Sequence, residues 1–188
     1  MNHIENLSQE ERQVLLRLAR QTLELGRVPD LEPENLSLRL REQAATFVTL
    51  TTREGALRGC IGTLEAYQPL ALDVCEHALA AAREDYRFPP VRLQELPDIR
   101  IEISRLTPPA PLHYNRPEEL LQKLRPGIDG VTLRDGARRA TFLPQVWEKL
   151  PDPEEFLDHQ CLKMGSPSSV WRHRILRVET YQVEEFHE

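Results

Sequence analysis

Cys60 is the residue of this sequence whose neighbours most favour chemistry. It lies in the segment Leu57-Arg58-Gly59-Cys60-Ile61-Gly62, between two glycines and two positions after an arginine. A thiolate is a strong nucleophile, and a nearby guanidinium favours that ionised form. Glycines let the backbone approach a ligand closely and leave peptide N–H groups for an oxyanion or a carboxylate. The segment is therefore a candidate site, with Cys60 as nucleophile and Arg58, Gly59 and Gly62 as ligand contacts.

The same segment also fits a purely structural role. A cysteine is often a small buried hydrophobic residue, and glycines in a strand often mark a bulge or a close approach of two backbones. Arg58 and Cys60 both occupy even positions, so on a regular strand they share one face. An arginine is out of place on a buried face. The pattern therefore favours either a face that lines a ligand site or a glycine bulge that redirects one side chain.

Three charged residues elsewhere are further candidates for ligand contact. Asp85 and Arg87 follow the end of a predicted helix, where they either orient a ligand or form a pair that fixes the turn. Lys163 lies near the end of a late helix, where it either complements the helix dipole or projects toward a ligand. A nucleophilic cysteine also needs a base. His77 and His159 lie on predicted helices, but neither has a sequence signal that assigns it this role.

The sequence predicts no metal site and identifies no cofactor. His159 and Cys161 are potential ligands, but no second pair follows at a spacing that suits zinc. The three cysteines are widely spaced, which fits free thiols in a reducing compartment better than a disulfide framework. The polar N-terminal segment lacks the apolar region of a signal peptide, and no apolar run approaches the ~20 residues that span a bilayer. We therefore expect a cytoplasmic protein with no membrane segment.

The formal net charge is −6, which disfavours nucleic acid as a partner. Two basic clusters are exceptions, and contact with RNA through such a patch is one hypothesis. The overall acidity and the lack of an aromatic stacking platform favour a solvated surface instead. The first cluster comprises Arg134, Arg138 and Arg139, and the second comprises Arg172, His173, Arg174 and Arg177.

Periodicity and turn residues predict the elements that position Cys60. Residues 45–52 are rich in β-branched and aromatic side chains and predict a strand. A turn at residues 53–55 and a returning strand over 56–64 complete a hairpin, with Cys60 on its second arm. The other predicted elements are a helix from the capping box of residues 8–11 to Gly26, a helix over 69–83, an alternating strand over 99–106, a short helix over 117–124, strands over 130–133 and 137–143, a helix over 152–164 and a final strand over 174–186.

Helices alternate with strands that return as hairpins, which indicates an α+β fold with mainly antiparallel sheet. The length of 188 residues suits one domain. The proline-rich stretch 107–111 is a stiff connector, and it is the predicted boundary of a smaller inserted lobe.

Several segments together resemble the AMMECR family, called AmmeMemoRadiSam system protein A in prokaryotes. The resemblance spans about residues 44–186, and the Cys60 hexamer is its most specific motif. The other segments are Phe47-Val48-Thr49-Leu50, Asp85-Tyr86-Arg87-Phe88, Glu102-Ile103-Ser104, Gly127-Ile128-Asp129-Gly130, Thr141-Phe142-Leu143-Pro144-Gln145-Val146-Trp147 and Cys161-Leu162-Lys163-Met164-Gly165.

This resemblance implies a single AMMECR-type domain over residues 1–188, with a smaller lobe at about 108–150 and a groove between it and a larger lobe. It also implies a Memo-like protein and a radical SAM enzyme as partners. It supplies no established activity, so whether the chain is an enzyme stays open. Three hypotheses follow: a protein that binds or transforms a small ligand around Cys60, a non-catalytic partner of the Memo-like protein, and an RNA-associated module.

Overall fold

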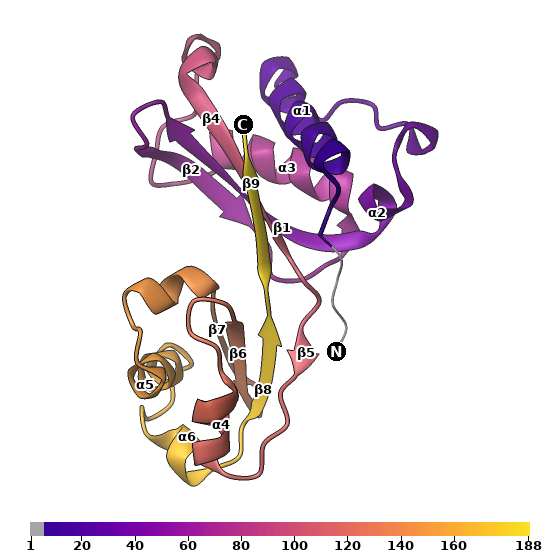
Figure 1. Cartoon of the computed structure of the whole chain (residues 1–188). Coiled ribbons are helices and arrows are strands. Elements are labelled where there is room, and N and C mark those ends of the chain that lie inside the picture. Colours follow the sequence, from indigo (N-terminus) through magenta and orange to yellow (C-terminus); the bar gives the residue numbers. More distant parts are fainter. Residues whose placement is uncertain (1–5) are drawn as a thin grey trace. The chain divides into compact units, whose positions relative to one another are not determined.

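The computed structural model describes residues 6–188, and the chain divides into two compact units (Figure 1). The first unit comprises Met1–Thr107 and Glu184–Glu188, and the second comprises Pro108–Val183. The second unit is thus an insertion in the sequence of the first. The range 108–150, expected for a smaller lobe, lies inside the second unit.

The first unit is built on a mainly antiparallel sheet. The predicted hairpin is confirmed: β1 (Gln43–Thr52) pairs with β2 (Leu57–Gly62), and Thr49 lies opposite Cys60. β1 also pairs along its length with β4 (Ile99–Leu106), which leaves β2 at the edge of the strand order β2-β1-β4-β9. The remaining strands are the short β3 (Gln68–Pro69), which pairs with the start of β1, and β9 (Val183–His187), which lies next to β4.

Two helices, α1 (Gln9–Leu25) and α3 (Leu70–Arg83), pack with this sheet in one hydrophobic core (Figure 1). The predicted capping box of α1 is present, and Gly26 ends the helix with a φ of 65°. Each large aliphatic side chain buried in this core stabilises the fold by roughly 1.5–3 kcal/mol. The fully buried members include Leu15, Val48, Leu50, Val74, Ile101 and Ile103. A short helix, α2 (Leu38–Arg41), precedes β1 and is not predicted by the sequence pattern.

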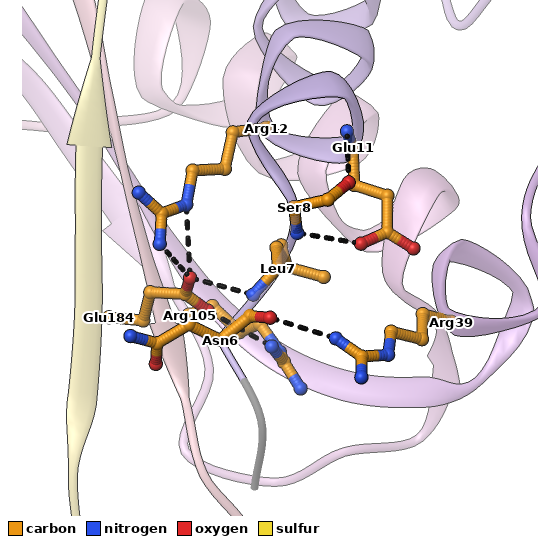
Figure 2. Close-up of polar contacts among 8 residues, drawn as sticks. All are labelled: Asn6, Leu7, Ser8, Glu11, Arg12, Arg39, Arg105 and Glu184. Atoms are coloured by element: carbon orange, nitrogen blue, oxygen red, sulfur yellow. Dashed lines mark hydrogen bonds and ion pairs between the residues drawn. The ribbon is translucent and has the colours of Figure 1, made fainter.

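The carboxylate of Glu184, in β9, fastens the start of α1 to β4 (Figure 2). One oxygen of Glu184 accepts the peptide N–H of Leu7 at 2.9 Å and an N–H of Arg12 at 2.8 Å. Its other oxygen accepts an N–H of Arg105, at the end of β4, at 3.0 Å. Glu184 is the first residue of the first unit after the insertion. This carboxylate therefore ties the returning chain to both α1 and β4.

The second unit has its own antiparallel sheet and its own core. The predicted hairpin is confirmed as β6 (Gly130–Asp135) and β7 (Arg138–Phe142). β8 (Arg177–Tyr181) pairs with β6, and the short β5 (Ala110–Pro111) pairs with β8. The predicted cap of the late helix α5 (Pro153–Lys163) is also confirmed, because the Asp152 side chain accepts the N–H groups of Glu154 and Glu155. The other α-helices of this unit are α4 (Pro117–Lys123) and α6 (Val170–His173).

The prediction of one final strand over 174–186 is wrong. The segment begins at the end of α6 and then forms two strands, β8 and β9, which belong to different sheets. Residues of strand type continue through Gln182, so local pattern cannot show that the chain changes pairing partners there. Pairing is a long-range property that the sequence of one strand does not carry.

Candidate functional site

Cys60 lies in the middle of β2, on the face of the first sheet that points away from α3. Its neighbour Gly59 is buried against α3, since a Cβ placed there would lie 2.1 Å from the carbonyl oxygen of Ala81. Ile61 packs against the core on the same side. Successive side chains of a strand point to opposite faces, so the Cys60 side chain leaves the helix-covered face. It is half-buried there.

The sulfur of Cys60 has a polar neighbour on the adjacent strand. Thr49 lies directly opposite it in register and donates its hydroxyl to Sγ at 3.3 Å. On the far side of Thr49 lies Glu102 of β4, also directly opposite. The three residues therefore form one cross-strand row on the face away from α3. Thr49 holds the sulfur in a defined position in this row.

Two side chains occupy the hydrogen-bonding edge of β2 at Cys60. The carboxylate of Asp85 accepts the peptide N–H of Cys60 at 2.8 Å. The Arg87 guanidinium lies 3.5 Å from the peptide oxygen of Cys60. Peptide groups at a sheet edge normally need water or another strand as partners. The pair formed by Asp85 and Arg87 thus takes the place of a neighbouring strand.

Asp85 and Arg87 also bind each other, through the Nε and Nη2 atoms of the guanidinium. The Nε–Oδ1 distance is 2.9 Å and the Nη2–Oδ2 distance is 2.6 Å, a forked geometry that strengthens the bond. The Arg87 guanidinium, together with the N–H of Cys60, holds the pKa of Asp85 well below its usual range although the carboxyl is buried. Asp85 is therefore an ionised brace for the Cys60 backbone.

The guanidinium of Arg58 does not contact Cys60 and binds the segment after α3 instead. Its Nε lies 3.0 Å from a carboxylate oxygen of Glu95, and its Nη1 donates to the carbonyl of Pro89 at 2.8 Å. These bonds fasten the segment after α3 along the edge of β2. The guanidinium that contacts Cys60 is that of Arg87, through the peptide oxygen.

Close packing requires glycine at both Gly59 and Gly62. The Gly59 position is filled by the backbone of α3, as described above. At Gly62 a Cβ would lie 2.4 Å from the Phe47 ring and 2.4 Å from the carbonyl oxygen of Thr46. A side chain at either position would collide with its surroundings. Ligand contact by these two glycines stays a prediction, because packing alone accounts for their presence.

Lys163 and the two helical histidines each have a partner other than Cys60. Lys163 belongs to the second unit, where its Nζ donates to the carbonyl of Thr141 at 2.8 Å. His159 lies in the same unit and contacts the carbonyl of Glu155. His77 is on the α3 side of the first sheet, where its Nδ1 lies 3.1 Å from a carboxylate oxygen of Asp73. This places His77 on the opposite face of the sheet from the Cys60 side chain.

Sequence reasoning missed Thr49 as part of the site. The register of the hairpin would have identified it, but an irregularity between Leu50 and Thr51 shifts that register between the turn and Cys60. Among residues 6–188, no group of three His, Cys, Asp or Glu side chains is placed to hold a metal ion. None of the described helices has the length and apolar character needed to cross a bilayer.

The chain is an α+β protein with mainly antiparallel sheets. Its candidate site is a cysteine on an edge strand whose backbone is held by the side chains of Asp85 and Arg87. The AMMECR1 family model matches residues 16–186, so this chain belongs to the AMMECR1 family. A relative from Thermofilum pendens is 42% identical, over 96% of this chain and 91% of its own length. Another from Methanothermobacter thermautotrophicus is 40% identical, over 97% of this chain and 96% of its own. The crystal structure of the uncharacterized protein PH0010 from Pyrococcus horikoshii has a TM-score of 0.79 at 35% identity, covering 97% of this chain and 93% of that one.

Proposed function

We propose that this protein binds a small ligand around Cys60 and acts in the cytoplasm with a Memo-like protein and a radical SAM enzyme. The observation that carries the proposal is the half-buried Cys60 on an edge strand whose backbone is held by an ionised carboxylate–guanidinium pair. In this proposal Cys60 and Arg87 contact the ligand, while Asp85 and Thr49 position them. The family resemblance supports the two protein partners, and the three free cysteines fit the proposed compartment.

Arg87 supports the ligand contact because part of its guanidinium remains open. Its side chain is 44% exposed, and two of its three nitrogens bind Asp85. Within the described residues, its Nη1 has no hydrogen-bond partner. The guanidinium also lies over the Phe88 ring, 5.5 Å from its centre, which restricts its position. A rigid donor beside a thiol suits a ligand that carries a carboxylate or another oxyanion.

Labelling of the native protein with iodoacetamide, mapped by mass spectrometry across pH, tests the site. We expect rapid labelling of Cys60, while the buried Cys75 and Cys161 serve as internal controls and stay protected. A Cys60 rate no higher than that of a model thiol removes the nucleophile from the proposal but leaves ligand contact. Protection of Cys60 equal to that of Cys161 removes the site altogether.

A non-catalytic role as partner of the Memo-like protein is the second candidate. The observation that favours it is the exposure of Tyr86, at 95%, between Asp85 and Arg87. Leu93, on the segment that Arg58 fastens, is 70% exposed. Large patches of exposed apolar side chains often mark a protein interface. Size-exclusion chromatography with the Memo-like protein is the test: Tyr86→Ala should abolish co-elution, and Tyr67→Ala, at another exposed tyrosine of the first unit, should not.

A further inference from the structure

Glu102 of β4 extends the row of Cys60 and Thr49 toward the centre of the first sheet. It lies directly opposite Thr49, and its neighbours Ile101 and Ile103 are fully buried in the core that contains α3. The Glu102 side chain therefore leaves the other face of the sheet, where the Cys60 side chain also lies. Directly opposite Cβ atoms are ~4.5–5.5 Å apart, so the Cβ atoms of Glu102 and Cys60 lie about 10 Å apart.

The carboxylate of Glu102 is half-buried and available to a ligand. Within residues 6–188, no hydrogen bond or ion pair holds it. Arg100, two residues away on the same face, is exposed and forms no ion pair with it. A charge that is partly removed from water costs free energy when it lacks a partner. A cationic group placed beside Glu102 would therefore be bound favourably.

Hydrogen-bond acceptors lie side by side at this end of the row. Thr49 donates its hydroxyl hydrogen to Sγ of Cys60 at 3.3 Å, so its oxygen offers only lone pairs to a ligand. The ionised carboxylate of Glu102 likewise only accepts. Two neighbouring acceptors, one of them charged, suit a group that donates several hydrogen bonds and carries positive charge, such as an ammonium group.

The other end of the row has the opposite character. Arg87 lies at the outer edge of β2, with its Nη2 3.5 Å from the peptide oxygen of Cys60. Its Nε and Nη2 bind Asp85, and the side chain is 44% exposed, so Nη1 remains for a carboxylate. Cys60 thus lies between a donor at the edge of β2 and an acceptor on β4.

The Phe47 ring borders the row on one side. Phe47 lies two residues from Thr49 on the same face of β1, and it is directly opposite both Gly62 and Ser104. A Cβ at Gly62 would lie 2.4 Å from the ring, so the ring leans over β2 at this glycine. The ring therefore forms an apolar wall, against which the part of a ligand between two charged ends can pack.

We infer that the ligand of the Cys60 site is a short zwitterion of about dipeptide length, with its carboxylate on Arg87 and its ammonium group on Glu102. An extended chain spans ~3.5 Å per residue, and a hydrogen bond adds ~2.9 Å at each end, so two residues match a span somewhat above 10 Å. This inference rests on the function proposed for Cys60 and adds the class of ligand. Glu102 is a binding residue in it, and the sulfur faces the middle of the ligand.

Isothermal titration with glycylglycine tests this inference. N-acetylglycylglycine lacks the ammonium group and glycylglycinamide lacks the carboxylate, so each should bind the wild type at least ~10-fold more weakly. Glu102→Gln should weaken the binding of glycylglycine by a similar factor and leave that of N-acetylglycylglycine unchanged. Glu24→Gln, at an exposed glutamate of α1, removes the same charge elsewhere in the first unit and should bind like the wild type.

Thermal unfolding guards against a variant that simply misfolds. Without ligand, Glu102→Gln should unfold at the wild-type temperature or above it, because the substitution breaks no bond within residues 6–188. Glycylglycine should raise the unfolding temperature of the wild type and of Glu24→Gln, and should raise that of Glu102→Gln less. It should also slow the labelling of Cys60 by iodoacetamide in the wild type, because the ligand covers the sulfur.

The outcomes separate this inference from the function proposed for Cys60. Glycylglycine that binds Glu102→Gln as tightly as the wild type overturns the inference. So does N-acetylglycylglycine that binds and protects Cys60 as well as glycylglycine does. A ligand carboxylate at Arg87 and Cys60 would survive both results. Absence of glycylglycine binding to the wild type also overturns the inference, and the labelling rate of Cys60 without ligand then decides the proposed function alone. Weaker binding of glycine than of glycylglycine supports the inferred span.

Discussion

Two arginine–aspartate pairs of nearly the same geometry have different roles in this molecule. Arg87 binds Asp85 with two nitrogens in the first unit, and Arg125 binds Asp129 in the same forked way in the second. Both aspartates are buried. Asp129 takes its other side-chain hydrogen bond from the peptide N–H of Arg125, within its own loop. Asp85 takes one from Cys60, 25 residues away.

A short-range ion pair therefore supports a distant segment only when its carboxylate can accept a further hydrogen bond from that segment. In the loop of Arg125 the pair is a local clasp. In the loop of Arg87 the same chemistry reaches across to an edge strand and holds the backbone of Cys60. Four measurements on variants and across pH distinguish the roles of the two pairs.

Asp85→Asn should have the largest effect. It removes the charge from a buried forked pair and weakens the bond to the Cys60 N–H, so we expect a loss of about 3 kcal/mol in the free energy of unfolding. It should also raise the rate of iodoacetamide labelling at Cys60, because β2 loses its brace. Urea unfolding and labelling measure the two effects. Asp129→Asn is the matched control, and a similar rise in Cys60 labelling there would end the distinction.

Gly59→Ala should cost about 2–3 kcal/mol, since its Cβ would meet a backbone oxygen of α3 that cannot move aside cheaply. Gly127, in the loop of Arg125, has open space around it but a φ of 76°. Gly127→Ala should therefore cost only about 1 kcal/mol, the strain of a left-handed backbone. Chemical unfolding of both variants compares a packing cost with a conformational one. Equal losses of unfolding free energy in the two variants would show that the contact between Gly59 and α3 adds no packing cost.

Acid should weaken the brace at Cys60. The folded state lowers the pKa of Asp85, because Arg87 and the Cys60 N–H favour its charged form. The stability from this group is therefore complete above the unfolded pKa of about 3.9 and is lost as pH falls through the lower folded pKa. Urea unfolding from pH 6 downward should show a loss in the wild type that is smaller in Asp85→Asn. Identical pH profiles would show that Asp85 contributes nothing to acid sensitivity.

Thr49→Val should have the smallest effect on stability, about 0.5–1.5 kcal/mol, because it removes one weak hydrogen bond to sulfur. Its main result should be a changed labelling rate at Cys60 with β2 still in place. Thr51→Val, on the same strand beyond the irregularity, is the control and should leave that rate unaltered. A rate that responds to both substitutions, or to neither, would separate Thr49 from the site.

The hairpin, the capped helices and the Cys60 segment could all be predicted from the sequence. Each depends on local signals: β-branched runs around a glycine turn, the Ser8 and Asp152 caps, and a specific hexamer. The resemblance to the AMMECR family rests on the same kind of contiguous motif, and the family model that matches spans residues 16–186. The partners of Arg58 could not be predicted, because they depend on where the segment after α3 lies along β2.

Local sequence patterns specify most of the helices and strands, and they specify the family, since neighbouring residues in the chain carry these signals. Long-range contacts in the folded chain set three other features: Asp85 braces Cys60, His77 lies across the sheet from the Cys60 side chain, and β8 and β9 belong to different sheets. The physical reason is that these outcomes depend on burial and hydrogen-bond partners far apart in sequence. Local propensity does not predict which distant group will accept the hydrogen bond of an edge-strand N–H.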